Sequence, residues 1–255
     1  QNAANGVICV GELGFAFPSE KVQVMGSGIF ITGTDKGLGR ARAQRFLHSG
    51  VAVFAGRYSP SCGAVNDAAR GNGMLTEVPL DITDLGSVRE AARIVSTYND
   101  SIDVLVNNAA VLSRLDGVLE EVDFGQVMQT IDVNACGPLR VVQQFLPLLQ
   151  AGKEKRIVNI SSEAASIQDC ERTAWYGYCM SKAALNMQSR ILANYLAPQG
   201  FRVIAVHPCG MKTDMLPSCA QSPGEAAESI YALVDNPDIA AGELFVQFDG
   251  TALHF

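Results

Sequence analysis

From residue 28 onward, short runs of apolar, β-prone residues alternate with longer stretches of helical pattern. The runs are almost continuously apolar, which is typical of strands covered on both faces of a parallel sheet. The stretches between them, such as 39–50, 85–98 and 127–152, have the pattern of crossover helices. The alternation predicts an α/β fold, a doubly wound parallel sheet with helices on both faces. The expected strands, about seven, are 28–32, 51–56, 75–80, 103–109, 156–161, 201–208 and 244–248.

Length and composition favour one domain. The chain has 255 residues, of which 48% are hydrophobic and 18% charged, enough for a large core. No repeat or Pro-rich linker divides it, so we expect residues 28–255 to form a single domain and residues 1–27 to be an N-terminal arm of unknown role. The formal charge is -7 and basic runs are absent, which argues against nucleic acid as a partner. No apolar stretch approaches the ~20 residues of a membrane helix, so no membrane partner is expected.

The seven cysteines are odd in number and scattered, without C-x-x-C pairs. This arrangement argues against a disulfide framework and against a zinc site, so no metal is expected. It is typical of reduced, mostly buried thiols, which predicts a cytoplasmic protein.

A glycine-rich stretch, "TGTDKGLGR" (32–40), directly follows the first expected strand. Its glycines are spaced G-x-x-x-G-x-G before a helical run, where they allow a tight turn and close approach of the backbone to phosphates. The helix that follows offers unpaired N–H groups to a dinucleotide pyrophosphate. The alternative is an ordinary strand-to-helix turn. The candidate binding residues are Gly33, Lys36, Gly37, Leu38 and Gly39.

The end of the second expected strand, "FAGRYS", offers Arg57 where an Asp or Glu would bind a free ribose 2′-hydroxyl. Arginine is suited to phosphate, and Lys36 adds a second cation at the same end. The pattern therefore favours NADPH over NADH. The alternative is that both cations are solvated surface residues.

The segment "TAWYGYCMSK" (173–182) carries two tyrosines ahead of a lysine. Residues four apart share a helix face, so Tyr178 is a neighbour of Lys182, whereas Tyr176, six residues away, is not. A phenol has a pKa near ~10, and a nearby ammonium is expected to lower it and ease proton exchange. Alone, the spacing also fits an ordinary amphipathic helix.

Four motifs occur in order: "TGTDKGLG" (32–39), "NNAA" (107–110), "ISS" with "YCMSK" (160–162 and 178–182), and "VHPCGMKTDM" (206–215). In these the chain resembles the short-chain dehydrogenase/reductase family, over roughly residues 28–250, and most the branch of carbonyl reductases and C-factor-like proteins. The resemblance implies a Rossmann-type fold and an oxidoreductase that reversibly reduces an aldehyde or ketone to an alcohol. In that reaction a nicotinamide cofactor supplies hydride and Tyr178 donates the proton.

The same resemblance implies roles for further residues. Ser162 would contact the substrate oxygen, with Ser161 less suited by register, and the Asn134 amide would anchor a water that relays protons from Lys182. Lys182 would also hold the nicotinamide ribose. The remaining cofactor residues would be Asp81 and Ile82 at the adenine, Asn108 at the nucleotide, and Pro208, Met211 and Thr213 at the nicotinamide, with Cys209 standing where the family commonly has glycine.

Two further expectations follow from the resemblance. The long helices expected around 118–150 and 174–198 offer apolar faces of the kind through which the family forms homodimers or homotetramers. A different functional class also fits the same motifs, an NADP(H)-binding regulatory or signalling protein with little turnover. The complete set of four proposed catalytic residues favours the enzyme.

Overall fold

The computed structural model describes residues 28–59, 65, 74–112, 119–208, 227–228, 231–234 and 242–255. Within them, a parallel sheet has the strand order β3-β2-β1-β4-β5-β6-β7. This confirms the doubly wound, Rossmann-type sheet, and each strand lies within one or two residues of its expected bounds. The expected arm, residues 1–27, lies outside the described residues. The strands are β1 Gly28–Ile31, β2 Ala52–Arg57, β3 Leu75–Pro79, β4 Ile102–Asn107, β5 Arg156–Ile160, β6 Arg202–His207 and β7 Phe245–Gln247.

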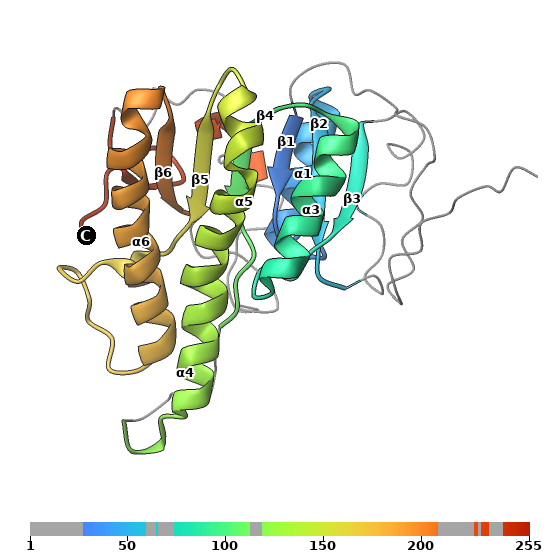
Figure 1. Cartoon of the computed structure of the whole chain (residues 1–255). Coiled ribbons are helices and arrows are strands. Elements are labelled where there is room, and N and C mark those ends of the chain that lie inside the picture. The colour runs from blue at the N-terminus through green and yellow to red at the C-terminus, as the bar shows by residue number, and fades with distance from the viewer. Residues whose placement is uncertain are drawn as a thin grey trace, which may run out of the picture.

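Helices cover both faces of the sheet. Helices α3, α5 and α6 stand side by side in front of the strands in Figure 1, while α1 packs on the opposite face together with residues 227 and 231–234. The longer helices are α1 Gly37–His48, α3 Leu85–Tyr98, α4 Phe124–Ile131, α5 Gly137–Ala151 and α6 Tyr176–Leu196, and the short 3₁₀ turns are η1 Leu119–Glu121, η3 Glu163–Ala165 and η4 Ala197–Gln199.

The stretch 127–152 was expected to form one helix. In the structure the helical region begins earlier, at Phe124. A π-helical segment, η2 Asp132–Cys136, divides it into α4 and α5. Such π-bulges are frequent at functional sites, and this one contains Asn134.

Alternate residues of the strands feed two hydrophobic cores, one on each face. In β1, Ile29 and Ile31 pack with Phe46 of α1, whereas Phe30 faces the other way and its ring lies 4.2 Å from that of Phe145 in α5. Successive strand residues point to opposite faces, so a strand covered on both sides must be apolar throughout. This is why the strands could be recognised as continuous apolar runs.

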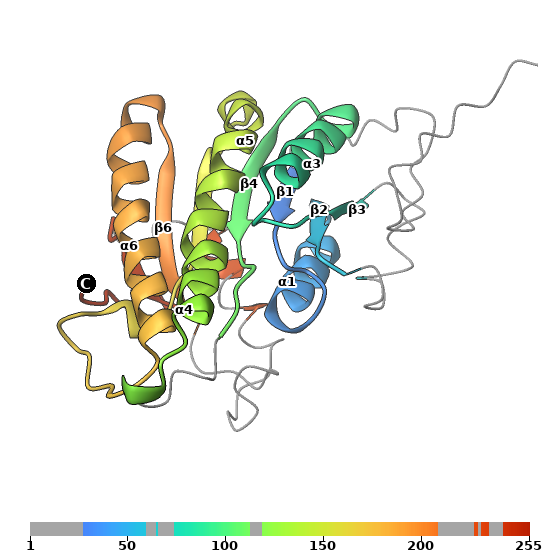
Figure 2. The ribbon, with the colours of Figure 1, turned by 60° about the horizontal axis from the view of Figure 1, so that its bottom comes forward.

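All strands are parallel, so their carboxyl ends meet at one edge of the sheet. Figure 2 turns this edge forward, with the loop after β5 and the start of α6 beside α4. The strand order reverses between β1 and β4, and open α/β sheets bind ligands in the crevice outside such a reversal. The structure therefore places the glycine turn, Ser162 and His207 at the same edge.

The cysteines differ from expectation. Among the described residues, Cys136 and Cys170 are free and exposed and Cys179 is free and half-buried, so the expectation of mostly buried thiols is wrong for these three. They lie on helical and loop surfaces, where the apolar pattern of the strands gives no information about burial.

The described part of the chain contains no group of His, Cys, Asp and Glu side chains arranged to hold a metal ion. None of its described helices has both the length and the apolar character needed to cross a membrane.

Candidate active site

The turn after β1 is built so that glycine is required at two positions. Gly33 has φ +68, and a Cβ atom there would lie 2.7 Å from Cα of Ala109. A Cβ on Gly39 would overlap the carbonyl oxygen of Gly33 and the amide of Asn108. The turn therefore packs tightly against the residues that follow β4. Because glycine has no side chain, a ligand can approach the backbone of the turn closely.

The N-terminus of α1 faces this turn without a side-chain cap. Lys36 precedes the helix in extended conformation and makes no capping hydrogen bond, and the first turn holds no acidic residue. Uncapped N–H groups at the positive end of a helix attract an anionic group, so the cradle fits a dinucleotide pyrophosphate. The side chain of Lys36 is exposed, whereas that of Leu38 is buried in the core, so only the backbone of Leu38 is available to a phosphate.

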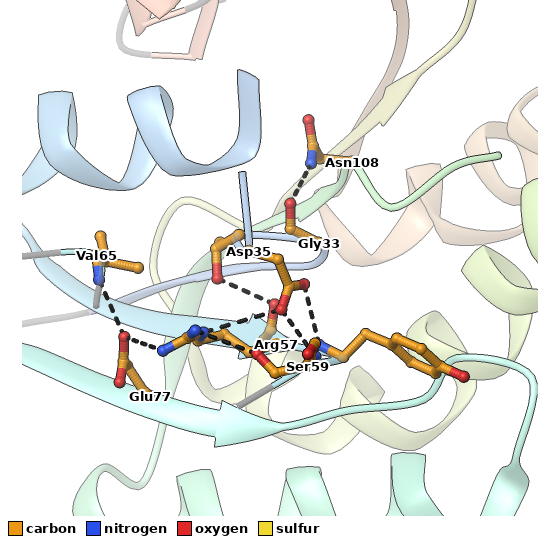
Figure 3. A network of polar contacts seen from close by, with 10 residues as sticks. Gly33, Asp35, Arg57, Ser59, Val65, Glu77 and Asn108 are labelled. Atoms are coloured by element: carbon orange, nitrogen blue, oxygen red, sulfur yellow. Dashed lines mark hydrogen bonds and ion pairs between the residues drawn. The ribbon is translucent and has the colours of Figure 1, made fainter. Parts of the chain in front are cut away.

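Asn108 ties the ends of β1 and β4 together. Its Nδ2 donates to the carbonyl oxygens of Thr32, at 2.9 Å, and Gly33, at 3.1 Å, and the second of these is drawn in Figure 3. Its Oδ1 accepts from the fully buried Arg42 at 3.1 Å. Asn108 thus shapes the nucleotide turn through its amide, and direct contact with the nucleotide stays a prediction.

Arg57 is buried, not a solvated surface cation. Its guanidinium donates to Oε1 of Glu77 at 2.8 Å and to the carbonyl oxygen of Ser59 at 3.2 Å, and its Nε lies 3.9 Å from Oδ1 of Asp35 (Figure 3). The Asp35 carboxylate in turn accepts from the backbone N–H groups of Tyr58, at 3.0 Å, and Ser59, at 2.8 Å. Two carboxylates therefore share the arginine expected to bind a 2′-phosphate.

Of the other cofactor candidates, the structure describes three, and two lie outside the described residues. Asp81 accepts from the backbone N–H and hydroxyl of Thr83, at 2.8 and 2.6 Å, which stabilises the turn after β3. Ile82 is buried and its side chain fills the space above Gly137 at the start of α5, so it packs in the core. Pro208 is buried directly after β6. Met211 and Thr213, and also Cys209, lie outside the described residues.

The two serines after β5 point in different directions. Ser161 donates to Oδ1 of Asn186 at 2.7 Å, and so it faces the buried side of α6. Ser162 caps η3 by accepting from the backbone N–H of Ala164 at 3.1 Å, and its hydroxyl donates to Oε2 of Glu163 at 2.6 Å. A side-chain hydrogen bond also links Ser162 to Tyr178. The structure thus brings Ser162, and not Ser161, to the tyrosine.

Tyr178 and Lys182 lie one turn apart on α6, as their spacing predicts. The Lys182 Nζ is 5.7 Å from the centre of the tyrosine ring and donates to the carbonyl oxygen of Ile160 at 2.7 Å. Burial lowers the lysine pKa to about 7. Burial also raises the pKa of Tyr178 to about 12, against the opposing effect of the Ser162 hydrogen bond. The expectation that the lysine would lower the phenol pKa is therefore wrong, because desolvation dominates.

Asn134 is buried in the π-helical segment. Its Nδ2 donates to the carbonyl oxygen of Val111, at 2.9 Å, and to Oγ of Ser181, at 3.0 Å, while its Oδ1 accepts from the Val111 N–H at 2.8 Å. Both amide hydrogens are thus committed to joining the loop after β4 to α6. The water-anchoring role of this residue stays a prediction, and its amide hydrogens would not serve it.

Sequence reasoning missed four charged residues at this edge. Asp35 and Glu77 surround Arg57, and Glu163 and Arg172 form an ion pair next to Ser162. Asp35 and Glu163 stand directly inside or beside recognised motifs, so their position in sequence was an available signal. Glu77 and Arg172 had no such signal, since only the fold brings them to the site.

Comparison with known proteins identifies the family. The sequence model of the short chain dehydrogenase family matches residues 27–223. An uncharacterized oxidoreductase of Schizosaccharomyces pombe is 31% identical over 88% of this chain and 96% of its own length. The C-signal protein of Myxococcus xanthus is 35% identical over 59% of this chain and 90% of its own length. The NADPH-bound carbonyl reductase from chicken fatty liver superposes with a TM-score of 0.79 at 26% identity, covering 89% of this chain and 98% of that one. The chain belongs to the short-chain dehydrogenase/reductase family of oxidoreductases.

Proposed function

We propose that this chain is an NADP(H)-dependent carbonyl reductase that interconverts an aldehyde or ketone and the corresponding alcohol. The observation that carries the proposal is the convergence of Ser162, Tyr178 and Lys182 at the carboxyl edge of the sheet, with the serine hydrogen-bonded to the tyrosine. A bound nicotinamide supplies or accepts the hydride in this chemistry. The residues of the chain bind the substrate and handle the proton.

Tyr178 is the proton donor to the carbonyl oxygen. With a pKa raised to about 12, the phenol holds its proton at neutral pH, as a general acid must. The same shift makes loss of that proton harder in the direction of alcohol oxidation. Lys182, with a pKa lowered to about 7, can return a proton towards the tyrosine near neutral pH, since its amine and ammonium forms are both populated there.

The chain's own groups fit a dinucleotide along the carboxyl edge. The pyrophosphate would lie against the glycine turn and the uncapped N-terminus of α1, and Lys182 would contact the nicotinamide ribose. The adenosine ribose would lie at the ends of β1 and β2, beside Asp35 and Arg57. The proposed preference for NADPH rests on Arg57. A 2′-phosphate that displaces Asp35 can bind the Arg57 guanidinium bidentately.

The test is NADPH consumption against a panel of aldehydes, ketones and quinones, with NADH as the alternative cofactor. Turnover that disappears in Tyr178→Phe supports the reductase. Turnover that persists undiminished in that variant contradicts the role of the tyrosine.

A second candidate is a nucleotide-binding regulatory protein with little turnover. It is favoured by one contact, because the Ser162 hydroxyl is already donated to Glu163 and is not directed towards a substrate. Tight NADPH binding without consumption across the whole panel would support this reading over the reductase.

We also propose that the protein is cytoplasmic, as its free thiols suggest.

A further proposal is that two copies associate through the face formed by α4, α5 and α6. Large apolar side chains are exposed along these helices, as is common at interfaces between subunits. They are Phe124, Met128, Leu139, Met187, Ile191 and Tyr195. Light scattering after size exclusion should give the mass of a dimer or a tetramer, and Ile191→Asp should give that of a monomer. A monomeric parent protein contradicts this proposal.

A further inference from the structure

The carboxylate of Glu163 lies directly beside the proposed substrate-binding serine. Glu163 opens the short turn η3 and accepts the hydroxyl of Ser162 on Oε2 at 2.6 Å. Its side chain is 46% exposed, so the carboxylate is open to a molecule that enters from solvent. No role has been given to this residue by the family motifs above.

One cationic side chain and one imidazole, both from other parts of the chain, lie against the carboxylate. Arg172, from the loop before α6, donates to Oε1, and its guanidinium lies 5.5 Å from the ring of Trp175. The Nδ1 of His207, at the end of β6, lies 3.3 Å from Oε2. Burial acts to raise the pKa of Glu163, but the Ser162 hydrogen bond and the charges of His207 and Arg172 outweigh it and lower that pKa. At neutral pH the carboxylate is therefore ionised and can only accept hydrogen bonds.

The hydrogen bonds of Ser162 leave none for a substrate. A serine hydroxyl has a single hydrogen, and here Glu163 accepts it. The oxygen of the same hydroxyl is contacted by the N–H of Ala164 and by Tyr178. When Ser162 donates to a carbonyl oxygen instead, Oε2 of Glu163 loses that hydrogen bond, and the loss is offset where another donor takes the place of Ser162.

We propose that Glu163 selects carbonyl substrates that carry a hydroxyl group on the carbon next to the carbonyl. This inference rests on the proposed reductase function. The substrate hydroxyl donates to Glu163 in place of Ser162, and the released Ser162 hydroxyl donates to the carbonyl oxygen beside Tyr178. An α-hydroxy carbonyl presents an acceptor and a donor on adjacent carbons, and Oγ of Ser162 and Oε2 of Glu163 present the complementary donor and acceptor 2.6 Å apart.

A simple ketone of the same size has no such donor. It must either leave Ser162 bound to Glu163, and so lose a hydrogen bond to the carbonyl oxygen, or draw Ser162 away, so that Oε2 of Glu163 loses its 2.6 Å hydrogen bond. Sites built to bind a substrate hydroxyl discriminate strongly against analogues that lack it, although the partial exposure of Glu163 to water reduces the penalty.

The test compares 2-hydroxyacetophenone with propiophenone, in which a methyl group replaces the hydroxyl at nearly constant volume. The ratio of their kcat/KM values is measured with each enzyme, so that differences in the active fraction cancel. The parent enzyme should prefer the hydroxyketone by about tenfold or more, as one hydrogen bond to a charged group implies. Glu163→Ala should bring the ratio towards one, by a loss for the hydroxyketone and a gain for propiophenone.

Two further variants complete the design. Glu163→Gln keeps an acceptor oxygen but removes the charge, so part of the preference should remain. Glu90→Ala removes the carboxylate of another ion pair on the remote helix α3 and should leave the ratio as in the parent.

Equal efficiencies of the parent enzyme on the two ketones would overturn the inference, and so would a ratio that Glu163→Ala and Glu163→Gln leave unchanged. Either result, with turnover that still depends on Tyr178, leaves the reductase standing. Absence of Tyr178-dependent turnover on these ketones and on the wider panel would instead overturn the reductase, and with it this inference.

Discussion

Lys182 donates a 2.7 Å hydrogen bond from Nζ to the carbonyl oxygen of Ile160, the last residue of β5. The bond crosses from α6 to the sheet and holds a buried amine one helical turn from Tyr178. Burial lowers the pKa of this lysine to about 7, well below its ordinary value of 10.5. Charge at this position is therefore set by pH in the neutral range.

The first prediction concerns stability as a function of pH. Between about pH 7 and about pH 10, the unfolded chain keeps the Lys182 proton and the folded chain has released it. The unfolded state then binds more protons, so this residue makes the free energy of unfolding rise with pH, by up to about 1.4 kcal/mol per pH unit. Urea titrations of the parent and of Lys182→Met across this range should diverge accordingly, whereas parallel curves would show an ordinary lysine pKa.

A second prediction separates the two tyrosines. Tyr178→Phe removes the proposed acid and should lower kcat by at least about 10²- to 10⁴-fold, the usual contribution of a general acid. Affinity for NADPH, followed by fluorescence, should change little. Tyr176→Phe is the matched control, since it removes the same hydroxyl at the start of the same helix, and it should keep most activity. Equal losses in the two variants would contradict the assignment.

The fold was predictable because its signals are local and repeated. Each strand is covered on both faces, so it appears in sequence as an apolar run such as 28–31, and the parallel order follows from the helices between runs. The π-helical segment around Asn134 gave no such signal, because its side chain is anchored by Val111 and Ser181, which the fold brings from outside the helix. Tertiary contacts decided that local geometry.

The sequence indicated which side chains the fold would bring together, but not their electrostatics. Spacing on one helix face was enough to choose Tyr178, and the interior contact of Ser161 with Asn186 agrees with the choice of Ser162. The direction of the tyrosine pKa shift depended on burial, which a sequence does not state. In the same way, the sequence indicated Arg57 as a phosphate ligand but did not reveal that Glu77, twenty residues away, pairs with it.

A third prediction tests how Asp35 and Arg57 set the preference between NADPH and NADH. Removing the charge in Asp35→Asn frees Arg57 from a competing carboxylate, so NADPH should bind several-fold more tightly while NADH does not gain. Arg57→Asp should weaken NADPH by about tenfold or more and NADH much less, as expected for a charge-assisted bond to phosphate. Dissociation constants from fluorescence titration provide the measurement, with Asp100→Asn, an exposed charge before β4, as the control. Equal changes for both cofactors would remove Arg57 from the 2′-phosphate site.

The last prediction concerns the glycine turn. In Gly39→Ala the new methyl group would overlap the carbonyl oxygen of Gly33 and the amide of Asn108, which are a backbone atom and a half-buried side chain fixed by hydrogen bonds. The turn should shift, so NADPH affinity should fall at least tenfold, and the helix-forming tendency of alanine should not compensate for the clash. Gly86→Ala is the matched control, because it lies in the first turn of α3, and its nearest neighbour, Oδ1 of Asp84, is at an ordinary 3.4 Å. There alanine should raise the free energy of unfolding by up to about 1 kcal/mol and leave NADPH binding unchanged. Unaltered NADPH affinity in Gly39→Ala would mean that the close contact between Gly39 and Gly33 does not shape the phosphate cradle.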